Sequence, residues 1–438
     1  MVPTLTDYLG TILTFMMKTL FGLALIALSS QAAAATQYIR FGKLIDGQGK
    51  VWTNVAVVVE NDRIVRVEPD AAPPPGAEMV DLRRYTGIPG MIDAHTHMTF
   101  YWDQTPGTTP WAQSGARQSA VTVFLAQENT RKTLETGVTT VRDLGSSEYA
   151  DVAMRDLINR GAMVGPRMFV AGYGLTVTDQ PARPGVGFPS GGTADGVAEV
   201  LRVVRQQVAA KVDVIKMYGS TGSDQDVTGF QTFTFDEIKA AVDVAHGYGR
   251  KLAFHTYGPD GARDAVRAGV DSIEHATDMD DQTIAEMARR GTFYVPTIDH
   301  NRYYVEYRQQ FGYNEEVAAR LNDYIQRNLE TARRAHKAGV RFAMGSDAVF
   351  TGFGQNTREL EWFVKAGMTA EQALATATSN GAALLGMEKS LGAIAPRYFA
   401  DIVAVDGDPL RDIGVVVRNV HWVMKGGKVV VDRTSNAK

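Results

Sequence analysis

Two histidines spaced one residue apart, His95 and His97, follow the apolar segment 90–94. Side chains two residues apart on a β-strand point to the same face, so both imidazoles can face one point in space. Neutral imidazole is a good ligand for Zn²⁺ and similar divalent ions. The pair therefore predicts a metal site, although a His-x-His pattern by itself also occurs in chains that bind no metal.

Four further residues with metal-binding or reactive side chains each end another apolar segment of the chain. They are Lys216, His255, His275 and Asp347. Taken alone, Lys216 fits a surface lysine whose stem packs on apolar neighbours, and Asp347 fits an acid that caps a helix. Together with the histidine pair, these residues occupy the ends of five predicted strands. This joint placement favours a single metal site.

The strands that must position these residues alternate with amphipathic segments between residues 87 and 389. Such alternation is typical of an α/β fold with a parallel sheet and crossover helices. The expected strands are residues 90–95, 138–141, 167–170, 212–216, 251–255, 272–275, 292–296 and 341–344. Eight strands close a (β/α)8 TIM barrel, in which active sites lie at the carboxyl ends of the strands. The predicted fold therefore brings the six candidate ligands to one face.

The two ends of the chain share a short, β-like pattern that differs from the middle. Segments rich in β-branched residues alternate there with Gly, Asn and Asp turns. The expected strands are residues 38–41, 55–59, 63–67, 401–405, 415–417 and 428–431. We therefore expect residues 36–86 and 390–438 to meet in one small sheet domain beside a barrel that spans residues 87–389.

Residues 1–35 have the pattern of an export signal. Lys18 precedes the apolar run 20–28, and a polar step then leads to a run of alanines. This order defines a secretory signal peptide, and the run is too short for a bilayer, which needs about 20 apolar residues. We expect an exported protein, periplasmic or secreted, without a stable membrane anchor once the signal is removed. Whether translation starts at Met1 or Met17 stays open.

The composition excludes several classes of protein. With 438 residues, 45% hydrophobic and 21% charged, the chain can bury a large core and is not disordered. Its 45 Lys and Arg against 49 Asp and Glu give a formal net charge of -4, without the basic excess that nucleic acid requires. The absence of cysteine excludes disulfides, thiolate catalysis and zinc–thiolate sites.

Over nearly the whole mature chain, the sequence resembles the metal-dependent amidohydrolase superfamily. The run Pro-Gly-Met-Ile-Asp-Ala-His-Thr-His, which ends at His97, carries the resemblance most specifically. The runs Val-Ile-Lys216-Met-Tyr, His255-Thr-Tyr, Ile-Glu-His275 and Met-Gly-Ser-Asp347 are similar to the imidazolonepropionase-related branch. That branch contains Xaa-Pro and Xaa-basic dipeptidases and amidases that cleave ochratoxin-like N-acyl amino acids. The resemblance implies a (β/α)8 barrel with a small β-sandwich domain formed by both termini.

The resemblance also implies how the ligands divide between two divalent metal ions. His95, His97 and Asp347 would hold one ion, and His255 and His275 would hold the other. Zn is the expected metal among first-row divalent ions. The two ions together would lower the pKa of a bridging water and polarise the carbonyl of the scissile amide.

Lys216 takes a special role in this family pattern. Reaction with carbon dioxide would convert its amine into a carbamate, an anionic ligand with two oxygens that can bridge two metals. Imidazolonepropionase resembles the pattern but is mononuclear, so Lys216 favours the two-metal, dipeptidase-like members. Asp347 would accept the proton of the attacking metal-bridging hydroxide and deliver it to the leaving nitrogen.

Four residues near the carboxyl ends of the strands are candidates for contact with the substrate. Tyr257, two residues beyond His255, could donate a hydrogen bond to the oxyanion, and Tyr218 is an alternative. Arg263 could pair with a free α-carboxylate of the substrate. Trp102 lies in an aromatic segment that favours a bulky or apolar substrate group. The competing interpretations are barrel packing for the aromatic residues and a solvated helix position for Arg263.

Four remaining histidines fall on predicted helices, on loops or in the end domain. At such positions we interpret them as surface or core residues rather than as ligands. They are His246, His300, His336 and His421.

The leading hypothesis is a binuclear metal-dependent amidohydrolase that acts on dipeptides or N-acyl amino acids, either Xaa-Pro dipeptides or ochratoxin-type amides. The alternative enzyme activity is hydrolysis of a cyclic amide or lactone. The alternative without enzyme activity is a non-catalytic barrel scaffold. The expected partner is a small-molecule substrate. The acyl group, the leaving amino acid and a homo-oligomeric state stay open.

Overall fold

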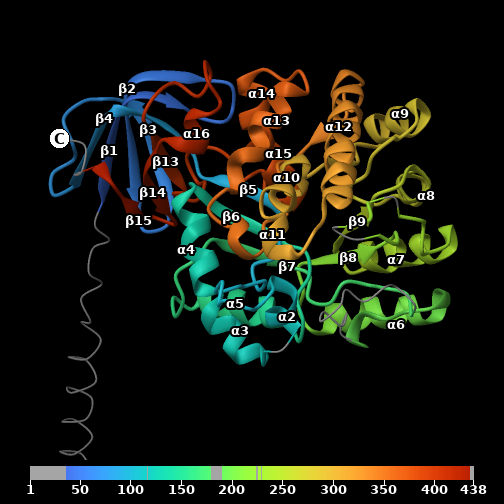
Figure 1. Cartoon of the computed structure of the whole chain (residues 1–438). Coiled ribbons are helices and arrows are strands. Elements are labelled where there is room, and N and C mark those ends of the chain that lie inside the picture. The colour runs from blue at the N-terminus through green and yellow to red at the C-terminus, as the bar shows by residue number, and fades with distance from the viewer. Residues whose placement is uncertain (1–35, 116, 179–189, 223–224, 228, 435–438) are drawn as a thin grey trace, which may run out of the picture.

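The computed structural model describes residues 36–115, 117–178, 190–222, 225–227 and 229–434. The predicted export signal, residues 1–35, lies outside them. Figure 1 shows two parts side by side: a β-sheet that contains both ends of the described chain, and a larger body in which helices surround the other strands.

Seven strands form the sheet beside the larger body, in the order β15-β14-β13-β4-β1-β2-β3. Their bounds are β1 (Gln37–Ile45), β2 (Val51–Glu60), β3 (Arg63–Pro69), β4 (Glu78–Pro89), β13 (Ile402–Val405), β14 (Val420–Lys425) and β15 (Lys428–Asp432). Strand β4 joins the two ends of the chain, because it pairs in parallel with β1 and antiparallel with β13. The expected sheet from both termini is confirmed, and β4 continues past the proposed domain boundary at residue 86.

Apolar side chains from both ends of the chain meet in this sheet. Ile39 of β1 and Val57 of β2 share one buried cluster with Ile402 of β13 and Trp422 of β14. Removing such side chains from water is favourable by about 25 cal/mol per Å² of apolar surface, so a common core holds the two ends together.

The expected strand at residues 415–417 is wrong. These residues belong to the short helix α16 (Val415–Arg418), and the strand of this region is β14. Asp412 Oδ1 accepts a hydrogen bond of 2.8 Å from the Gly414 amide and so makes a turn before the helix. Val415 and Val416 are buried in the large core cluster of the barrel. Tertiary burial thus outweighs the β-propensity of the three consecutive valines.

Parallel strands form the interior of the larger body, in two hydrogen-bonded groups, β5-β6-β7 and β8-β9-β10-β11-β12. Their bounds are β5 (Met91–Thr96), β6 (Val138–Asp143), β7 (Arg167–Val170), β8 (Val214–Tyr218), β9 (Lys251–Thr256), β10 (Ser272–His275), β11 (Phe293–Val295) and β12 (Arg341–Phe342). Each of the expected strands is present, with small shifts at its ends.

Backbone hydrogen bonds join the two groups of strands into a closed barrel. The Ala94 amide donates to the Met344 carbonyl at 2.7 Å, which connects the chain beyond β12 to β5. On the other side, the Leu175 amide donates to the Lys216 carbonyl at 2.8 Å, which connects the chain beyond β7 to β8. The predicted (β/α)8 barrel is therefore confirmed.

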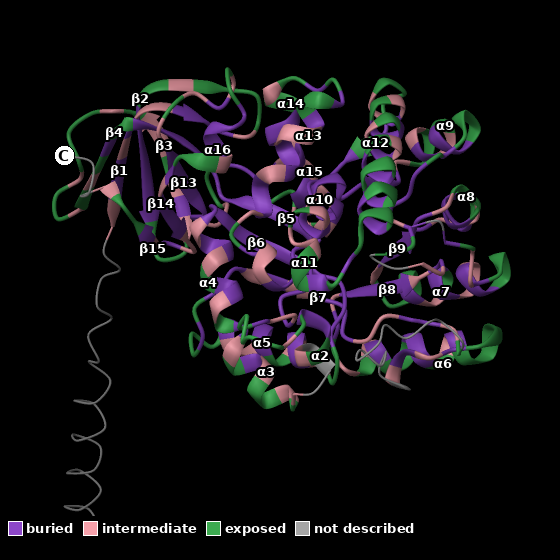
Figure 2. Ribbon diagram, in the orientation of Figure 1, coloured by how far each residue is buried: buried purple, intermediate pink, exposed green. Residues whose placement is uncertain are grey.

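Helices cover the outside of the barrel, and Figure 2 shows buried strands inside helices whose outer faces are exposed. The helices are α2 (Pro110–Gly115), α3 (Ser119–Leu125), α4 (Gln127–Glu135), α5 (Ala150–Asn159), α6 (Gly196–Ala209), α7 (Phe235–Gly247), α8 (Pro259–Ala268), α9 (Asp281–Arg290), α10 (Ile298–Glu306), α11 (Arg308–Phe311), α12 (Glu315–Lys337), α13 (Glu359–Lys365), α14 (Ala370–Thr376) and α15 (Ser379–Leu385). Short 3-10 helices are η1 (Ser190–Gly192), η2 (Phe350–Gly352) and η3 (Asn356–Arg358). Among the described residues, no helix combines the length and apolarity needed to cross a bilayer.

Local sequence explains where these helices begin and end. Helix α7 starts with a capping box, in which Thr234 accepts from the Glu237 amide and the Glu237 side chain accepts from the Thr234 amide. Such a cap contributes about 1 kcal/mol to helix stability. Helix α8 ends at Gly269, whose φ of 98° is accessible to glycine at little cost. These signals place the helix ends, while the apolar face of each helix packs on the barrel strands.

Candidate active site

His95, His97 and Asp347 form a compact group of candidate metal ligands near the carboxyl ends of β5 and β12. One donor atom of each lies within 4.8 Å of the others. Nε2 of His97 is 3.3 Å, and Nε2 of His95 is 3.6 Å, from Oδ1 of Asp347. A Cβ added to Gly345 would lie 2.8 Å from the Cβ of His95, so glycine is needed for the chain of Asp347 to approach β5 closely.

The other three predicted ligands lie directly beside this group. The rings of His255 and His275 have centroids 4.5 Å apart, and those of His95 and His275 are 4.9 Å apart. Lys216 Nζ lies 3.4 Å from His95 Nε2, and this lysine is fully buried. The barrel thus brings together all six residues that the sequence analysis selected as ligands.

Burial controls the charge of these side chains. The pKa of His95, His255 and His275 lies well below the usual value, chiefly because burial penalises the imidazolium and further because the Lys216 cation is near. Burial also lowers the pKa of Lys216 to about 8, although Glu274 and Asp347 act in the opposite direction. The three imidazoles are therefore neutral at neutral pH, which is the form that binds metal ions.

Left-handed backbone conformations occur at three non-glycine positions around the cluster. His275 at the end of β10, Thr297 after β11 and Asp347 after β12 have φ of 73°, 49° and 50°. Such residues are uncommon and occur preferentially at functional sites. Here the turn at Thr297 lets its hydroxyl lie 2.7 Å from Nδ1 of His275. The backbone therefore helps to aim the ligands in a way that strand alternation does not predict.

His300 lies buried in the site beside Asp347, a position that its interpretation as an ordinary surface or core residue did not anticipate. Its Nε2 is 3.2 Å from Oδ2 of Asp347. It lies on α10, which directly follows β11, and its ring packs edge-on against Tyr304. Burial tends to raise the pKa of Asp347, but His300 and His95 outweigh it and hold that pKa well below the usual value. The signal in the sequence was the position of His300 five residues after a barrel strand, on the active face.

An aromatic cavity opens above the predicted ligands. Side chains with aromatic or imidazole rings form most of its wall. The lining residues are His97, Phe100, Trp111, Tyr218, His255, Tyr257, His275, His300, Tyr304, Asp347 and Val349. The wall thus offers apolar and aromatic contacts to an organic substrate next to the candidate metal ligands.

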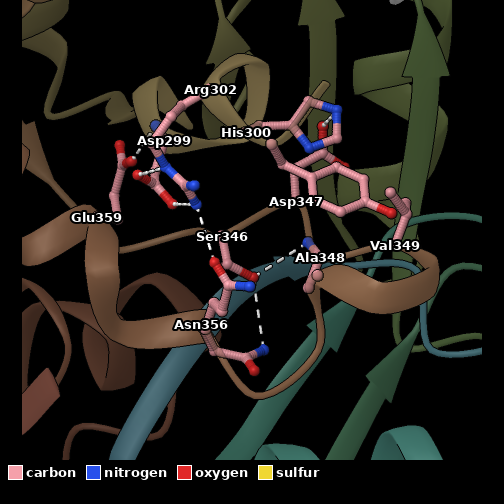
Figure 3. A pocket seen from close by; sticks show the side chains of 12 residues that line it. Asp299, His300, Arg302, Ser346, Asp347, Ala348, Val349, Asn356 and Glu359 are labelled. Carbon is pink, nitrogen blue, oxygen red and sulfur yellow. Dashed lines mark hydrogen bonds and ion pairs between the residues drawn. The ribbon is translucent and has the colours of Figure 1, made fainter. Parts of the chain in front are cut away.

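A second, polar cavity adjoins the first and shares with it His300, Asp347 and Val349. Figure 3 shows His300 and Asp347 at one end of this cavity and Glu359 and Asn356 at the other. Glu359 accepts hydrogen bonds from the amides of Ile298 and Asp299, and so caps the helix that carries His300. Burial raises the pKa of Glu359 to about 8.

Of the four residues predicted to contact the substrate, two line the aromatic cavity and two do not. Tyr257 and Tyr218 line the aromatic cavity, and their ring centroids are 4.7 and 5.5 Å from that of His255. Trp102 is buried in the aromatic cluster around this cavity and donates through Nε1 to Thr108, without being among the lining residues. Arg263 is an exposed side chain on α8.

Arg263 forms an ion pair of 2.9 Å with Asp260 of the same helix. Its side chain is 44% exposed and it is not among the residues that line either active-site cavity. This environment matches the alternative interpretation of a solvated helix arginine, and a carboxylate contact by Arg263 stays a prediction.

The donor set fits the divalent metal expected from the sequence. Neutral imidazole nitrogens and a carboxylate oxygen, converging from separate strands, are the ligands that Zn²⁺ and related ions prefer. The buried carboxylate of Asp347 keeps a negative charge beside the neutral rings of His95 and His275, and a bound cation would balance that charge. The described site is therefore a candidate metal centre at the floor of a substrate cavity.

Sequence comparison relates this chain to known hydrolases. The amidohydrolase family model matches residues 86–430. Ochratoxinase from Aspergillus niger is 31% identical to the chain, over 92% of this chain and 88% of that protein. Imidazolonepropionase from Cutibacterium acnes is 26% identical, over 88% of this chain and 89% of that protein.

Solved structures show the same similarity. A Xaa-Pro dipeptidase with bound methionine in the active site is 32% identical, with a TM-score of 0.80 over 90% of this chain and 99% of that one. A prolidase complexed with N-methylphosphonate-L-proline is 27% identical, with a TM-score of 0.82 over 91% of this chain and 100% of that one. The family match over most of the chain agrees with the barrel and its ligand cluster, and the chain therefore belongs to the amidohydrolase family and is a hydrolase of amide bonds.

Proposed function

We propose that this chain is a binuclear metal-dependent amidohydrolase that releases a carboxyl-terminal amino acid from dipeptides or N-acyl amino acids. The observation that carries the proposal is the convergence of six ligand-type side chains at the floor of one aromatic cavity. The ochratoxinase, prolidase and Xaa-Pro dipeptidase to which the chain is similar support this substrate class.

The presence of Lys216 favours a site with two metals over a site with one. It lies beside His95, and its ammonium form would repel a divalent cation. If the amine nitrogen bonds to the carbon of CO₂ and loses one proton, the product is a carbamate with one negative charge and two ligand oxygens. Burial favours this reaction, because the lowered pKa increases the fraction of neutral, nucleophilic amine.

The steps of amide hydrolysis itself depend on side chains that face the aromatic cavity. Metals in the cluster would acidify a water and polarise the amide carbonyl. As the water oxygen bonds to the carbonyl carbon, Asp347 accepts a proton, and it returns that proton to the nitrogen when the C–N bond breaks. Tyr257 or Tyr218 donates a hydrogen bond to the carbonyl oxygen as its negative charge develops. The aromatic walls exclude water and strengthen these charge interactions.

Metal removal tests the proposal. The full-length purified protein is assayed with Xaa-Pro, Xaa-Lys and Xaa-Phe dipeptides, N-aroyl amino acids, and a cyclic amide or lactone. We expect two metals per chain, cleavage of at least one amide with a free α-carboxylate, loss of that activity on chelation, and recovery with Zn²⁺ and bicarbonate. Activity that survives complete metal removal contradicts the mechanism, and activity on cyclic substrates alone contradicts the substrate class.

Trp111 provides a test of the aromatic wall. It is mostly buried and its ring lies 4.8 Å from that of Phe350. An aromatic contact is worth about 0.5–1.5 kcal/mol, so Trp111→Ala should lower kcat/KM for N-aroyl amino acids by about threefold to tenfold. Substrates with a small acyl group should change less. Phe124, which is 71% exposed on α3, is the control. If Phe124→Ala lowers kcat/KM as much as Trp111→Ala does, the result contradicts a role of Trp111 in the aromatic wall.

We further propose that the protein acts after export, in the periplasm or outside the cell. The proposal rests on residues 1–35, with their basic start, apolar run and alanine-rich end. Mass spectrometry of the exported protein tests it, because a mature chain that retains residue 1 would contradict cleavage of a signal.

A further inference from the structure

A buried carboxylate that the sequence analysis did not select, Glu274, contacts the ligand cluster from inside the barrel. Its Oε2 lies 2.8 Å from Nδ1 of His95, and the residue has no exposed surface. Its other oxygen, Oε1, accepts from Arg142 Nη2 at 2.8 Å and from the Ser272 hydroxyl at 2.5 Å. Glu274 therefore joins a metal-binding histidine to a buried guanidinium.

Arg142 is anchored on three sides. It is 2% exposed, and its Nη1 donates to the Ser272 hydroxyl at 2.9 Å. Its Nε donates at 2.6 Å to the carbonyl of Ala94, the residue that precedes His95. One rigid guanidinium thus holds both the backbone beside His95 and the carboxylate that meets the ring of His95.

The unusual backbone at the end of β10 brings Glu274 and His275 to the same side. Successive side chains of a regular strand point to opposite faces, so Glu274 and His275 should diverge. His275 instead has a φ of 73°, and both residues face His95: Glu274 through a hydrogen bond, and His275 through a ring contact at 4.9 Å. The left-handed conformation of His275 thus allows both the Glu274 carboxylate and the His275 ring to lie inside the barrel.

We propose that Glu274, held by Arg142, is a positioning residue that fixes the tautomer and orientation of His95 for metal binding. A carboxylate only accepts hydrogen bonds, so the proton of His95 resides on Nδ1 and the lone pair of Nε2 is available as a ligand. Nε2 points into the cluster, 3.4 Å from Lys216 Nζ and 3.6 Å from Asp347 Oδ1. The inference rests on the proposed metal-dependent function and adds residues outside the six ligands.

Zinc affinity is the measurement that separates this role from a structural one. Glu274→Gln keeps the shape of the side chain and removes its charge, so the hydrogen-bond acceptor of His95 weakens. We expect the affinity of the full-length apo-protein for Zn²⁺ at its first site, measured by competition with a chelating dye, to fall about 10-fold to 100-fold.

Asp401→Asn is the matched control. Asp401 is also buried and pairs with an arginine, Arg167, at 2.7 Å, but at the amino ends of the strands. Breaking either pair should lower the urea midpoint of unfolding, because a buried charge loses its partner. Only Glu274→Gln should weaken zinc binding. Equal zinc affinities for the two variants would overturn the inference.

Glu274→Asp covers the case in which Glu274→Gln does not fold. The shorter residue keeps a negative charge opposite Arg142 but cannot reach both that guanidinium and His95. We expect weaker zinc binding with an unfolding midpoint nearer that of the unmodified protein, and unchanged zinc binding would overturn the inference. If the unmodified protein itself binds no zinc, the proposed function fails rather than the role of Glu274 alone.

Discussion

Lys216→Ala is expected to lower kcat/KM for amide hydrolysis by about a thousandfold or more. The substitution removes the only buried amine in the described ligand cluster and with it the proposed carbamate between the two metals. Without that anion, the proposed second metal would lose a ligand and the activation of water would be impaired. Steady-state assays combined with metal analysis measure the effect, and we expect fewer than two metals per chain.

Small carboxylic acids should partly restore the Lys216→Ala enzyme, because formate or acetate can enter the vacated space and supply two ligand oxygens. Lys251→Ala is the control. Lys251 lies at the amino end of β9, where its amine donates to the Ala383 carbonyl at 3.1 Å, far along the strand from the ligand cluster. We expect this variant to keep its activity. A Lys216→Ala enzyme with two metals and full activity would contradict the bridging role.

Asp347→Asn is expected to lower kcat by about a hundredfold to ten-thousandfold, the usual contribution of a general acid–base group. Asparagine has the same shape and still offers an oxygen to a metal, but it cannot accept and return a proton. KM should change little, because the aromatic walls that hold the substrate stay in place. Unchanged kcat in a variant that retains its metals would contradict the role of Asp347 in proton transfer.

Substrates with better leaving groups provide the control for this interpretation. The alkoxide of an ester depends less on protonation to depart than an amide nitrogen does. Asp347→Asn should therefore affect ester hydrolysis less than amide hydrolysis. Equal losses on both would indicate either that the variant has lost metal binding or that Asp347 acts only by accepting the proton of the attacking water. Metal content, measured in parallel, distinguishes the two causes.

Much of the fold follows from local patterns in the sequence. The expected strands at residues 167–170 and 272–275 coincide with β7 and β10, because buried parallel strands are short and bounded by turns. Valines at 415–417 have the same local pattern yet form α16, because their neighbours Asp412 and Gly414 make a turn and the core accepts a helix there. Local propensity is weak where tertiary packing selects the conformation.

Prediction of the site was most successful where strand geometry alone sufficed. His95 and His97 face one carboxylate, as side chains two apart on a strand should. His300 was missed because it lies on α10 and reaches Asp347 only through the turn at Thr297, which has a left-handed backbone. Nothing in the local sequence around His300 indicates that turn.

The amino-acid sequence by itself determined the kinds of donor, the strands that carry them and the family to which the chain belongs. Only the tertiary structure decided that Glu274 and His275, adjacent on one strand, both face His95, and that Arg263 lies on an exposed helix surface. The physical reason is that these contacts depend on closure of the barrel and on a few left-handed residues. Both are set by packing and hydrogen bonds between segments far apart in the chain.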